Sequence, residues 1–122
     1  MKRILIIEDE LPLREAFAFL LQSEGYEVEV AENGKVGLEK LKSFQPDIIL
    51  LDLLMPVMNG IEFLKAQAKQ RGLGLHYKTL VLSNLSDPMS REDIREFHVA
   101  GVAMKADLSP AELAATVKKL VG

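Results

Sequence analysis

The chain has 122 residues, of which 15 are Lys or Arg and 18 are Asp or Glu, so its formal net charge is −3 and its isoelectric point lies near 5.4. This length suits one domain, which we expect to span residues 1–122, and the 48% hydrophobic fraction is ordinary for a globular protein. The absence of Cys excludes disulfide frameworks, thiolate metal sites and thiol catalysis. No apolar run reaches the roughly 18 residues of a membrane span, and the mild acidity gives no support to a nucleic-acid-binding surface. We therefore expect a soluble, cytoplasmic domain that binds neither membrane nor nucleic acid directly.

The first half of the chain alternates short apolar runs with amphipathic stretches. Ile4-Leu5-Ile6-Ile7 is a continuous apolar run, which predicts a buried strand. The apolar spacing after Pro12 predicts a helix that Gly25 ends, and residues 26–31 alternate like the edge strand of a sheet. In chain order the predicted elements are a strand at 4–7, a helix at 12–24, a strand at 26–31 and a helix at 35–44.

The second half repeats this alternation. Ile48-Ile49-Leu50-Leu51 is a second continuous apolar run, and Ser109, Pro110 and Glu112 form a capping-box start for the last helix. The predicted elements are a strand at 48–51, a helix from 60 that glycines close at 72–74, a strand at 79–82, a helix at 90–100, a strand at 102–104 and a helix at 110–121.

Five strands alternating with five helices predict an α/β fold. Apolar runs joined by helices indicate a parallel sheet that is covered on both faces, and right-handed crossovers limit it to a doubly wound topology. The flavodoxin-like strand order 2-1-3-4-5 fits best, because it places the alternating second strand at an edge.

Polar residues follow four of the predicted strands where each strand ends. Glu8 and Asp9 follow the first strand, Asp52 the third, Ser83 the fourth and Lys105 the fifth. In a doubly wound sheet these carboxyl ends meet at one edge, which is where such folds bind their ligands. The sequence therefore predicts a functional site that contains three carboxylates, one hydroxyl and one ammonium group.

Three carboxylates at one edge require a counter-charge. Two like charges about 4 Å apart repel by roughly 4 kcal/mol at an effective dielectric constant near 20. A hard divalent cation removes this cost, and an open edge with few carboxylates suits Mg²⁺, with Mn²⁺ as a substitute, better than Ca²⁺. With Lys105 and Ser83 available to contact a phosphoryl group, Asp52 is predicted to be a nucleophile that forms an acyl phosphate.

These residues resemble the receiver domain of bacterial two-component response regulators, over essentially the whole chain. Residues 52–60 read Asp-Leu-Leu-Met-Pro-Val-Met-Asn-Gly and are similar to the family's phosphoacceptor signature, Asp-x-x-Met-Pro-x-Met-Asp/Asn-Gly. The pair Glu8-Asp9 looks like the family's metal-binding pair. Ser83 and Lys105 match its strand-four hydroxyl and its strand-five lysine.

The resemblance implies transfer of a phosphoryl group onto Asp52 from a histidine kinase or a histidine phosphotransfer protein. It implies that Asp9, Asp52 and the backbone carbonyl of Leu54 ligate Mg²⁺, with Glu8 acting through water. The last predicted helix reaches the end of the chain, so we expect a stand-alone, non-enzymatic receiver that signals through phosphorylation-dependent protein binding. The sequence does not name its kinase or its target.

Three positions depart from the family pattern. Val102 stands where an aromatic switch residue is common, Ala106 stands where proline usually follows the lysine, and Asn84 replaces a small residue after Ser83. The aromatic account of signal transmission therefore cannot be transferred to this chain, and Asn84 predicts slow dephosphorylation. Val102 and Ala106 also favour an alternative, in which a degenerate receiver acts as a constitutive protein-interaction module.

Two other function classes fit the residues less well. An aspartyl-nucleophile phosphatase of the haloacid-dehalogenase type needs a second Asp where this chain has Leu54, and a flavin or nucleotide carrier needs a phosphate loop where it has Glu8-Asp9-Glu10. Phe19 leaves a separate question open, because it is either half-buried or part of the helix surface on which the family's kinases dock.

Overall fold

The structure is a computed structural model that describes residues 1–53, 58–70, 77–83, 99–105 and 108–121, with the side chains of residues 69, 70 and 83 left out of the description. It contains a five-stranded parallel sheet in the order β2-β1-β3-β4-β5. The strands are β1 (Arg3–Ile7), β2 (Glu27–Ala31), β3 (Ile48–Asp52), β4 (Lys78–Ser83) and β5 (Gly101–Met104). The described helices are α1 (Leu11–Ser23), α2 (Gly34–Phe44), α3 (Gly60–Gln70) and α5 (Pro110–Val121).

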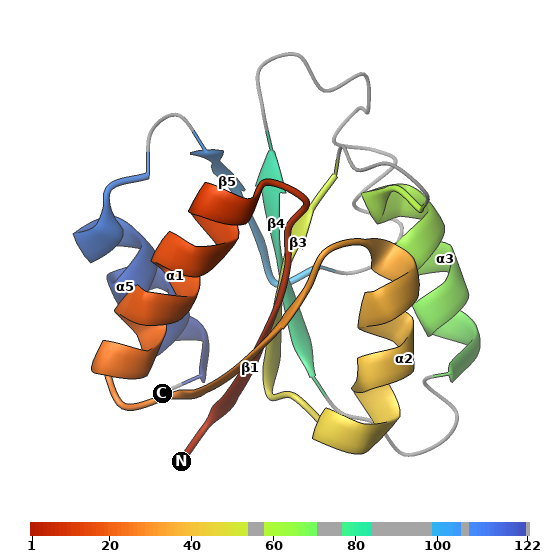
Figure 1. The fold of residues 1–122 in the computed structure, drawn as a ribbon, viewed down its shortest axis with the longest axis horizontal. Helices are drawn as coiled ribbons and strands as arrows, with labels where there is room; N and C mark the ends of the chain where they lie inside the picture. The colour runs from red at the N-terminus through yellow and green to blue at the C-terminus, as the bar shows by residue number, and fades with distance from the viewer. Residues whose placement is uncertain (54–57, 71–76, 84–98, 106–107, 122) are drawn as a thin grey trace.

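The helices cover both faces of the sheet. Figure 1 shows α1 and α5 on one face and α2 and α3 on the other. Because side chains alternate along a strand, each central strand contributes to two separate cores. Ile4, Ile6 and Leu50 pack toward α1 and α5, whereas Leu5, Ile7 and Leu51 pack toward α2 and α3, and all six side chains are fully buried.

The predicted doubly wound fold and its strand order are confirmed. The alternating strand β2 lies at an edge, as its pattern predicts, and its neighbour β1 is buried on both faces. Gly25 has a φ of 95°, a left-handed value that favours glycine, and it follows Glu24, the C-cap residue of α1. The helix predicted at 90–100 falls mainly on residues outside the described ranges, and its last two residues, Val99 and Ala100, are not helical.

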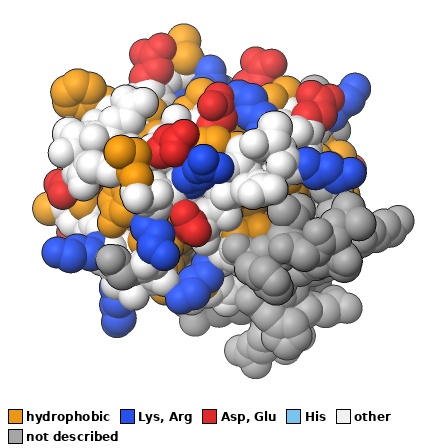
Figure 2. Space-filling model, turned by 90° about the horizontal axis from the view of Figure 1, so that it is seen from below, with side chains coloured by type: hydrophobic (Ala, Val, Ile, Leu, Met, Phe, Trp, Pro, Cys, Tyr) orange, Lys and Arg blue, Asp and Glu red, His pale blue; other side chains and the backbone are white. Residues whose placement is uncertain are grey.

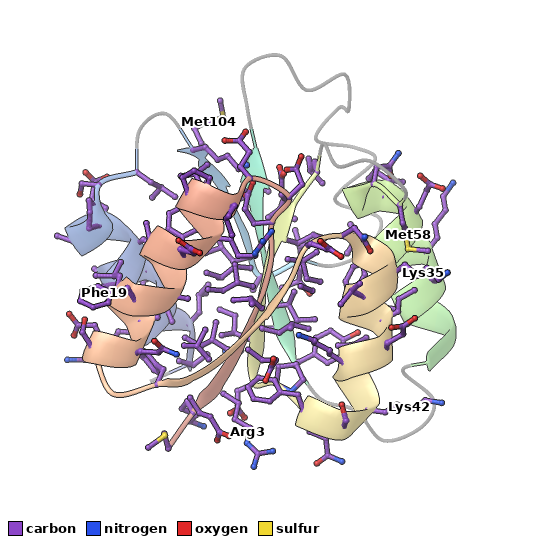
Figure 3. The ribbon with its side chains drawn as sticks, viewed as in Figure 1. Arg3, Phe19, Lys35, Lys42, Met58 and Met104 are labelled. Carbon is purple, nitrogen blue, oxygen red and sulfur yellow. The ribbon has the colours of Figure 1, made fainter. Side chains whose placement is uncertain are left out.

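Phe19 lies on the outer surface of α1. Its side chain points away from the sheet in Figure 3, and the residue is 76% exposed, so the half-buried alternative is wrong. In the described part of the chain, no helix combines the length and the apolar character that crossing a bilayer requires.

Candidate functional site

The carboxyl ends of the strands bring the predicted polar residues to one edge of the sheet. Ile7 of β1 pairs with Leu51 of β3, so Glu8 and Asp52 follow at the same level. Lys105 follows β5, whose register with β4 pairs Met104 with Ser83. This edge carries residues from strands that lie far apart in the sequence.

Lys105 forms ion pairs with two buried carboxylates. Its Nζ atom lies 2.7 Å from Oε2 of Glu8 and 3.1 Å from Oδ1 of Asp52. The side chain of Lys105 is 8% exposed, that of Asp52 is 2% exposed and that of Glu8 is fully buried. Water therefore screens these charges weakly, and the two carboxylates depend on Lys105 for their stabilisation.

Burial changes the protonation of this cluster. Burial, followed by the negative charge of Glu8, raises the pKa of Asp52 to about 7, and Lys105 only partly offsets this rise. Burial also raises the pKa of Glu8, again against an opposing effect of Lys105. Burial by itself lowers the pKa of Lys105, but its contacts with Glu8 and Asp52 outweigh that effect and raise it.

Asp9 completes the group of acidic side chains. The side chain of Asp9 is a further, smaller cause of the raised Asp52 pKa, which places the two carboxyl groups near one another across the ends of β1 and β3. Asp9 also offers a carboxylate oxygen within 4.8 Å of oxygens from Glu8 and Glu10. The carboxylates of Glu8 and Asp52 are thus ion-paired with Lys105, and Asp9 adds a third carboxylate beside them.

This donor set fits a divalent cation. When all groups are ionised, the three carboxylates and Lys105 leave a formal charge of −2. Glu8 Oε2 and Asp52 Oδ1 are buried, and among the described residues neither finds a hydrogen-bond partner of good geometry, although both are ion-paired with Lys105. Unused carboxylate acceptors with excess negative charge are what Mg²⁺ prefers. If Lys105 were the sole counter-ion, two of the three ionised carboxylates would have no compensating positive charge.

Gly60, the first residue of α3, lies close to the end of β3. The Gly60 N–H donates to the Leu53 carbonyl at 2.9 Å, and a Cβ atom at position 60 would lie 2.7 Å from the Leu53 Cα atom. Only glycine therefore fits this close approach without a backbone shift. Asn59 and Glu62 cap the helix reciprocally, since each side chain accepts a hydrogen bond from the backbone N–H of the other residue.

The structure describes the remaining predicted site residues only in part. Ser83 is the last residue of β4, but its side chain is not described. Leu54, Asn84 and Ala106 lie outside the described residues. Val102 lies on β5 and is 45% exposed, so the position where the family commonly has an aromatic residue carries an accessible aliphatic side chain in this chain.

One residue of the site was not foreseen from the sequence. Arg14, in the first turn of α1, donates from its Nη1 atom to the Glu8 carbonyl at 2.8 Å and to the Asp9 carbonyl at 3.4 Å. The only sequence signal is a basic residue five positions after an acidic pair, and such spacing occurs in many helices. The structure is needed to see that its guanidinium reaches back to the strand end.

A doubly wound parallel sheet with carboxylates after strands one and three and a lysine after strand five defines a receiver-type α/β domain. The model of the response regulator receiver domain matches residues 4–118, so the chain belongs to that family. Similar proteins include the phosphate regulon transcriptional regulatory protein PhoB of Escherichia coli, which is 31% identical over 98% of this chain and 52% of its own length. The alkaline phosphatase synthesis regulator SphR of Synechococcus elongatus is 32% identical over 86% of this chain and 40% of its own length.

Solved structures show the same relationship. Chemotaxis protein CheY4 of Vibrio cholerae superposes with a TM-score of 0.87 at 30% identity, covering 98% of both chains. Response regulator TrrA of Thermotoga maritima, solved in complex with Mg²⁺ and BeF, has a TM-score of 0.80 at 34% identity and covers 98% of this chain and 99% of its own. The chain thus spans about half the length of the curated relatives named above, but nearly all of these two structures.

Proposed function

We propose that this chain is a phosphoacceptor domain in which Asp52 receives a phosphoryl group from a histidine kinase or a histidine phosphotransfer protein. The observation that carries the proposal is the buried group formed by Glu8, Asp52 and Lys105 at the carboxyl ends of the strands. A fold has little use for two buried carboxylates beside one lysine unless they take part in chemistry, because an unbalanced buried charge costs stability.

Each residue has a distinct part in the proposed reaction. An oxygen of the Asp52 carboxylate attacks phosphorus, the new oxygen–phosphorus bond forms, and the phosphorus–nitrogen bond of the phosphohistidine donor breaks to release its imidazole. Lys105 already lies 3.1 Å from Asp52, so its ammonium group is positioned to contact an oxygen of the incoming phosphoryl group. We assign the same contact to the Ser83 hydroxyl by its place at the end of β4.

We propose that Asp9 and Asp52, together with the Leu54 carbonyl, hold Mg²⁺ or Mn²⁺. When bound, the ion neutralises negative charge on the carboxylates and on the transferred phosphoryl group. The likeness to TrrA, which was solved with Mg²⁺ and BeF, supports this assignment. Glu8 contributes differently, because its carboxylate is fully buried and is occupied by Lys105 at 2.7 Å. Its part is to hold the lysine and to add negative charge, with any contact to the ion made through water.

The activity of the longer relatives is not transferred to this chain. PhoB and SphR are named as transcriptional regulators, and this chain corresponds to about half of each. For the chain itself, a single receiver domain over residues 1–122, we propose signalling by phosphorylation-dependent binding of a protein target, without turnover of other substrates. The exposed face of α1, which includes Phe19, is the proposed kinase-docking surface.

The direct test is labelling with acetyl phosphate in the presence of Mg²⁺. We expect one phosphoryl group per chain, located on Asp52 by peptide mapping after borohydride reduction of the acyl phosphate. Asp52→Asn removes the label, and Asp47→Asn, a matched change at the opposite end of β3, leaves it unchanged. A label on any other residue, or an undiminished label on Asp52→Asn, rejects the proposal.

A second experiment separates a working switch from the constitutive-module alternative. Backbone amide spectra of the protein with and without acetyl phosphate should differ beyond the immediate surroundings of Asp52 if phosphorylation changes the surface. Changes restricted to the residues that touch the phosphoryl group favour the constitutive module.

A further inference from the structure

Arg14 reaches from α1 to the backbone of the acidic pair. Its Nη1 atom donates to the carbonyl oxygens of both Glu8 and Asp9, at 2.8 and 3.4 Å. The side chain is partly buried, and none of the ion pairs between described residues involves Arg14. No step of the proposed phosphotransfer uses this contact.

The position of Arg14 is electrostatically unfavourable for the helix itself. It lies in the first turn of α1, where the positive end of the helix dipole disfavours a cation. That first turn has no acidic residue, and the N-cap residue Glu10 makes no side-chain capping bond. A compensating benefit must therefore come from outside the helix, and the two carbonyl contacts are the only ones that the structure records for this guanidinium among the described residues.

The two contacts fix the direction of one particular side chain. Peptide units are planar, so a bond to the Glu8 carbonyl holds the plane before the Asp9 Cα atom, and a bond to the Asp9 carbonyl holds the plane after it. With both planes held, the direction of the Cα–Cβ bond of Asp9 is set. Further bonds hold the same segment: the Glu8 N–H donates to the Ala31 carbonyl at 3.0 Å, and the Glu10 N–H, which belongs to the peptide plane after Asp9, donates to the Glu8 carboxylate at 3.3 Å.

We propose that Arg14 is a positioning residue for the cation site, which holds the Asp9 carboxylate in the orientation that meets Asp52. This inference rests on the proposed function, because Asp9 is one of the assigned ligands. Residues that orient a metal ligand typically change metal affinity by about 10–100-fold when they are replaced.

The charge of Arg14 and its positioning role predict opposite results. If the guanidinium acted only as a nearby positive charge, its removal would strengthen cation binding, because like charges repel. If it orients Asp9, its removal weakens cation binding. The direction of the change in Mg²⁺ affinity therefore distinguishes the two roles.

The test compares Mg²⁺ affinity by calorimetric titration in the wild-type protein, Arg14→Met, Arg14→Lys and Arg3→Met. Arg3 is the matched control, because its guanidinium also donates to a backbone carbonyl at 2.8 Å, that of Phe44, at the far end of the sheet. We expect Arg14→Met to weaken Mg²⁺ binding by about 10–100-fold. We expect Arg14→Lys, which keeps the positive charge and N–H donors but loses the planar guanidinium, to recover part of this loss, and Arg3→Met to bind like wild type. Labelling of Arg14→Met by acetyl phosphate should approach the wild-type rate at saturating Mg²⁺.

Unfolding by urea in metal-free buffer gives each variant its stability, so that lost affinity is not confused with lost folding. If Arg14→Met fails to fold, Arg14→Lys with reduced affinity still supports the proposal. Unchanged or tighter Mg²⁺ binding in folded Arg14→Met, or an equal loss in Arg3→Met, overturns it. A wild-type protein that neither binds Mg²⁺ nor becomes labelled would instead reject the proposed function.

Discussion

Charged residues lie at both ends of the parallel sheet, but the two ends use them differently. At the amino end, Arg3 pairs with Glu27 at 3.1 Å and donates to the Phe44 carbonyl, while its N–H donates to Asp47. At the carboxyl end, Lys105 pairs with Glu8 and Asp52. The amino-end pair is exposed by 43% and 48%, whereas the three carboxyl-end side chains are at most 8% exposed.

This contrast separates a structural use of charge at the amino end from the use that we propose to be functional at the carboxyl end. Figure 2 views the molecule from the side on which the N-terminus lies in Figure 1, and it shows acidic and basic side chains interspersed over the described surface. Such exposed pairs are screened by water and contribute little to stability. At the carboxyl end burial weakens this screening, and there we propose that the excess carboxylates hold a cation and that Asp52 accepts a phosphoryl group.

The largest expected difference between the two ends concerns the loss of stability when the basic residue, Lys105 or Arg3, is replaced. Lys105→Met leaves Glu8 and Asp52 buried without their counter-ion, and removing one partner of a buried pair costs about 3–5 kcal/mol. Urea unfolding of the metal-free protein near neutral pH measures this loss. Added Mg²⁺ should recover more stability in Lys105→Met than in wild type, because the ion replaces the lost positive charge. A variant as stable as wild type in metal-free buffer would show that the cluster is not held by this lysine.

The second expected difference concerns how stability depends on pH, which we expect to be set by the buried carboxyl groups at the carboxyl end. Burial raises the pKa of Asp52 from its ordinary value of 3.8 to about 7 in the folded protein, so the folded state binds the proton more tightly than the unfolded state does. The stability that this proton contributes is fully present below 3.8 and is lost as the pH rises through about 7. The raised Glu8 pKa acts in the same direction.

The test compares the pH dependence of the free energy of unfolding for wild type and Asp52→Asn without metal. Each pKa unit corresponds to about 1.4 kcal/mol, so Asp52→Asn should gain a few kcal/mol relative to wild type across this range. A constant difference between wild type and Asp52→Asn at all pH values would contradict the raised pKa.

The smallest expected effect belongs to the amino end. Arg3→Met removes a half-exposed ion pair and one hydrogen bond to the Phe44 carbonyl, and we expect a loss of about 1 kcal/mol with no dependence on Mg²⁺. The same urea titrations measure it. A loss equal to that of Lys105→Met would remove the distinction between the two ends.

The fold could be predicted from the sequence because its signals are local. The apolar runs of β1 and β3, the alternation of β2 and the capping residues of α5 each determine one element, and the crossover rule then limits their order. Several observed element boundaries differ by one residue from the predicted ones. For example, β4 begins at Lys78 and β3 includes Asp52. Strand ends depend on hydrogen bonds to neighbouring strands, which a single segment does not reveal.

The site could be predicted as a list of residues but not as a set of contacts. The ends of three strands indicated Glu8, Asp52 and Lys105, yet the closer pairing of Lys105 with Glu8 depends on side-chain length and on the register of β1 and β3 across the sheet. Arg14 could not be predicted, because its partners are backbone carbonyls and carry no residue-specific signal. The roles of Ser83 and Leu54 stay predictions.

The most direct measurement is a calorimetric titration of the metal-free protein with Mg²⁺, run in parallel on wild type, Asp52→Asn and Asp47→Asn. These two variants make the same chemical change at opposite ends of β3. We predict saturable binding of one ion by wild type and by Asp47→Asn, and strongly weakened binding by Asp52→Asn. No binding by the wild-type protein, or equal binding by all three, would contradict a cation site at the carboxyl ends of the strands.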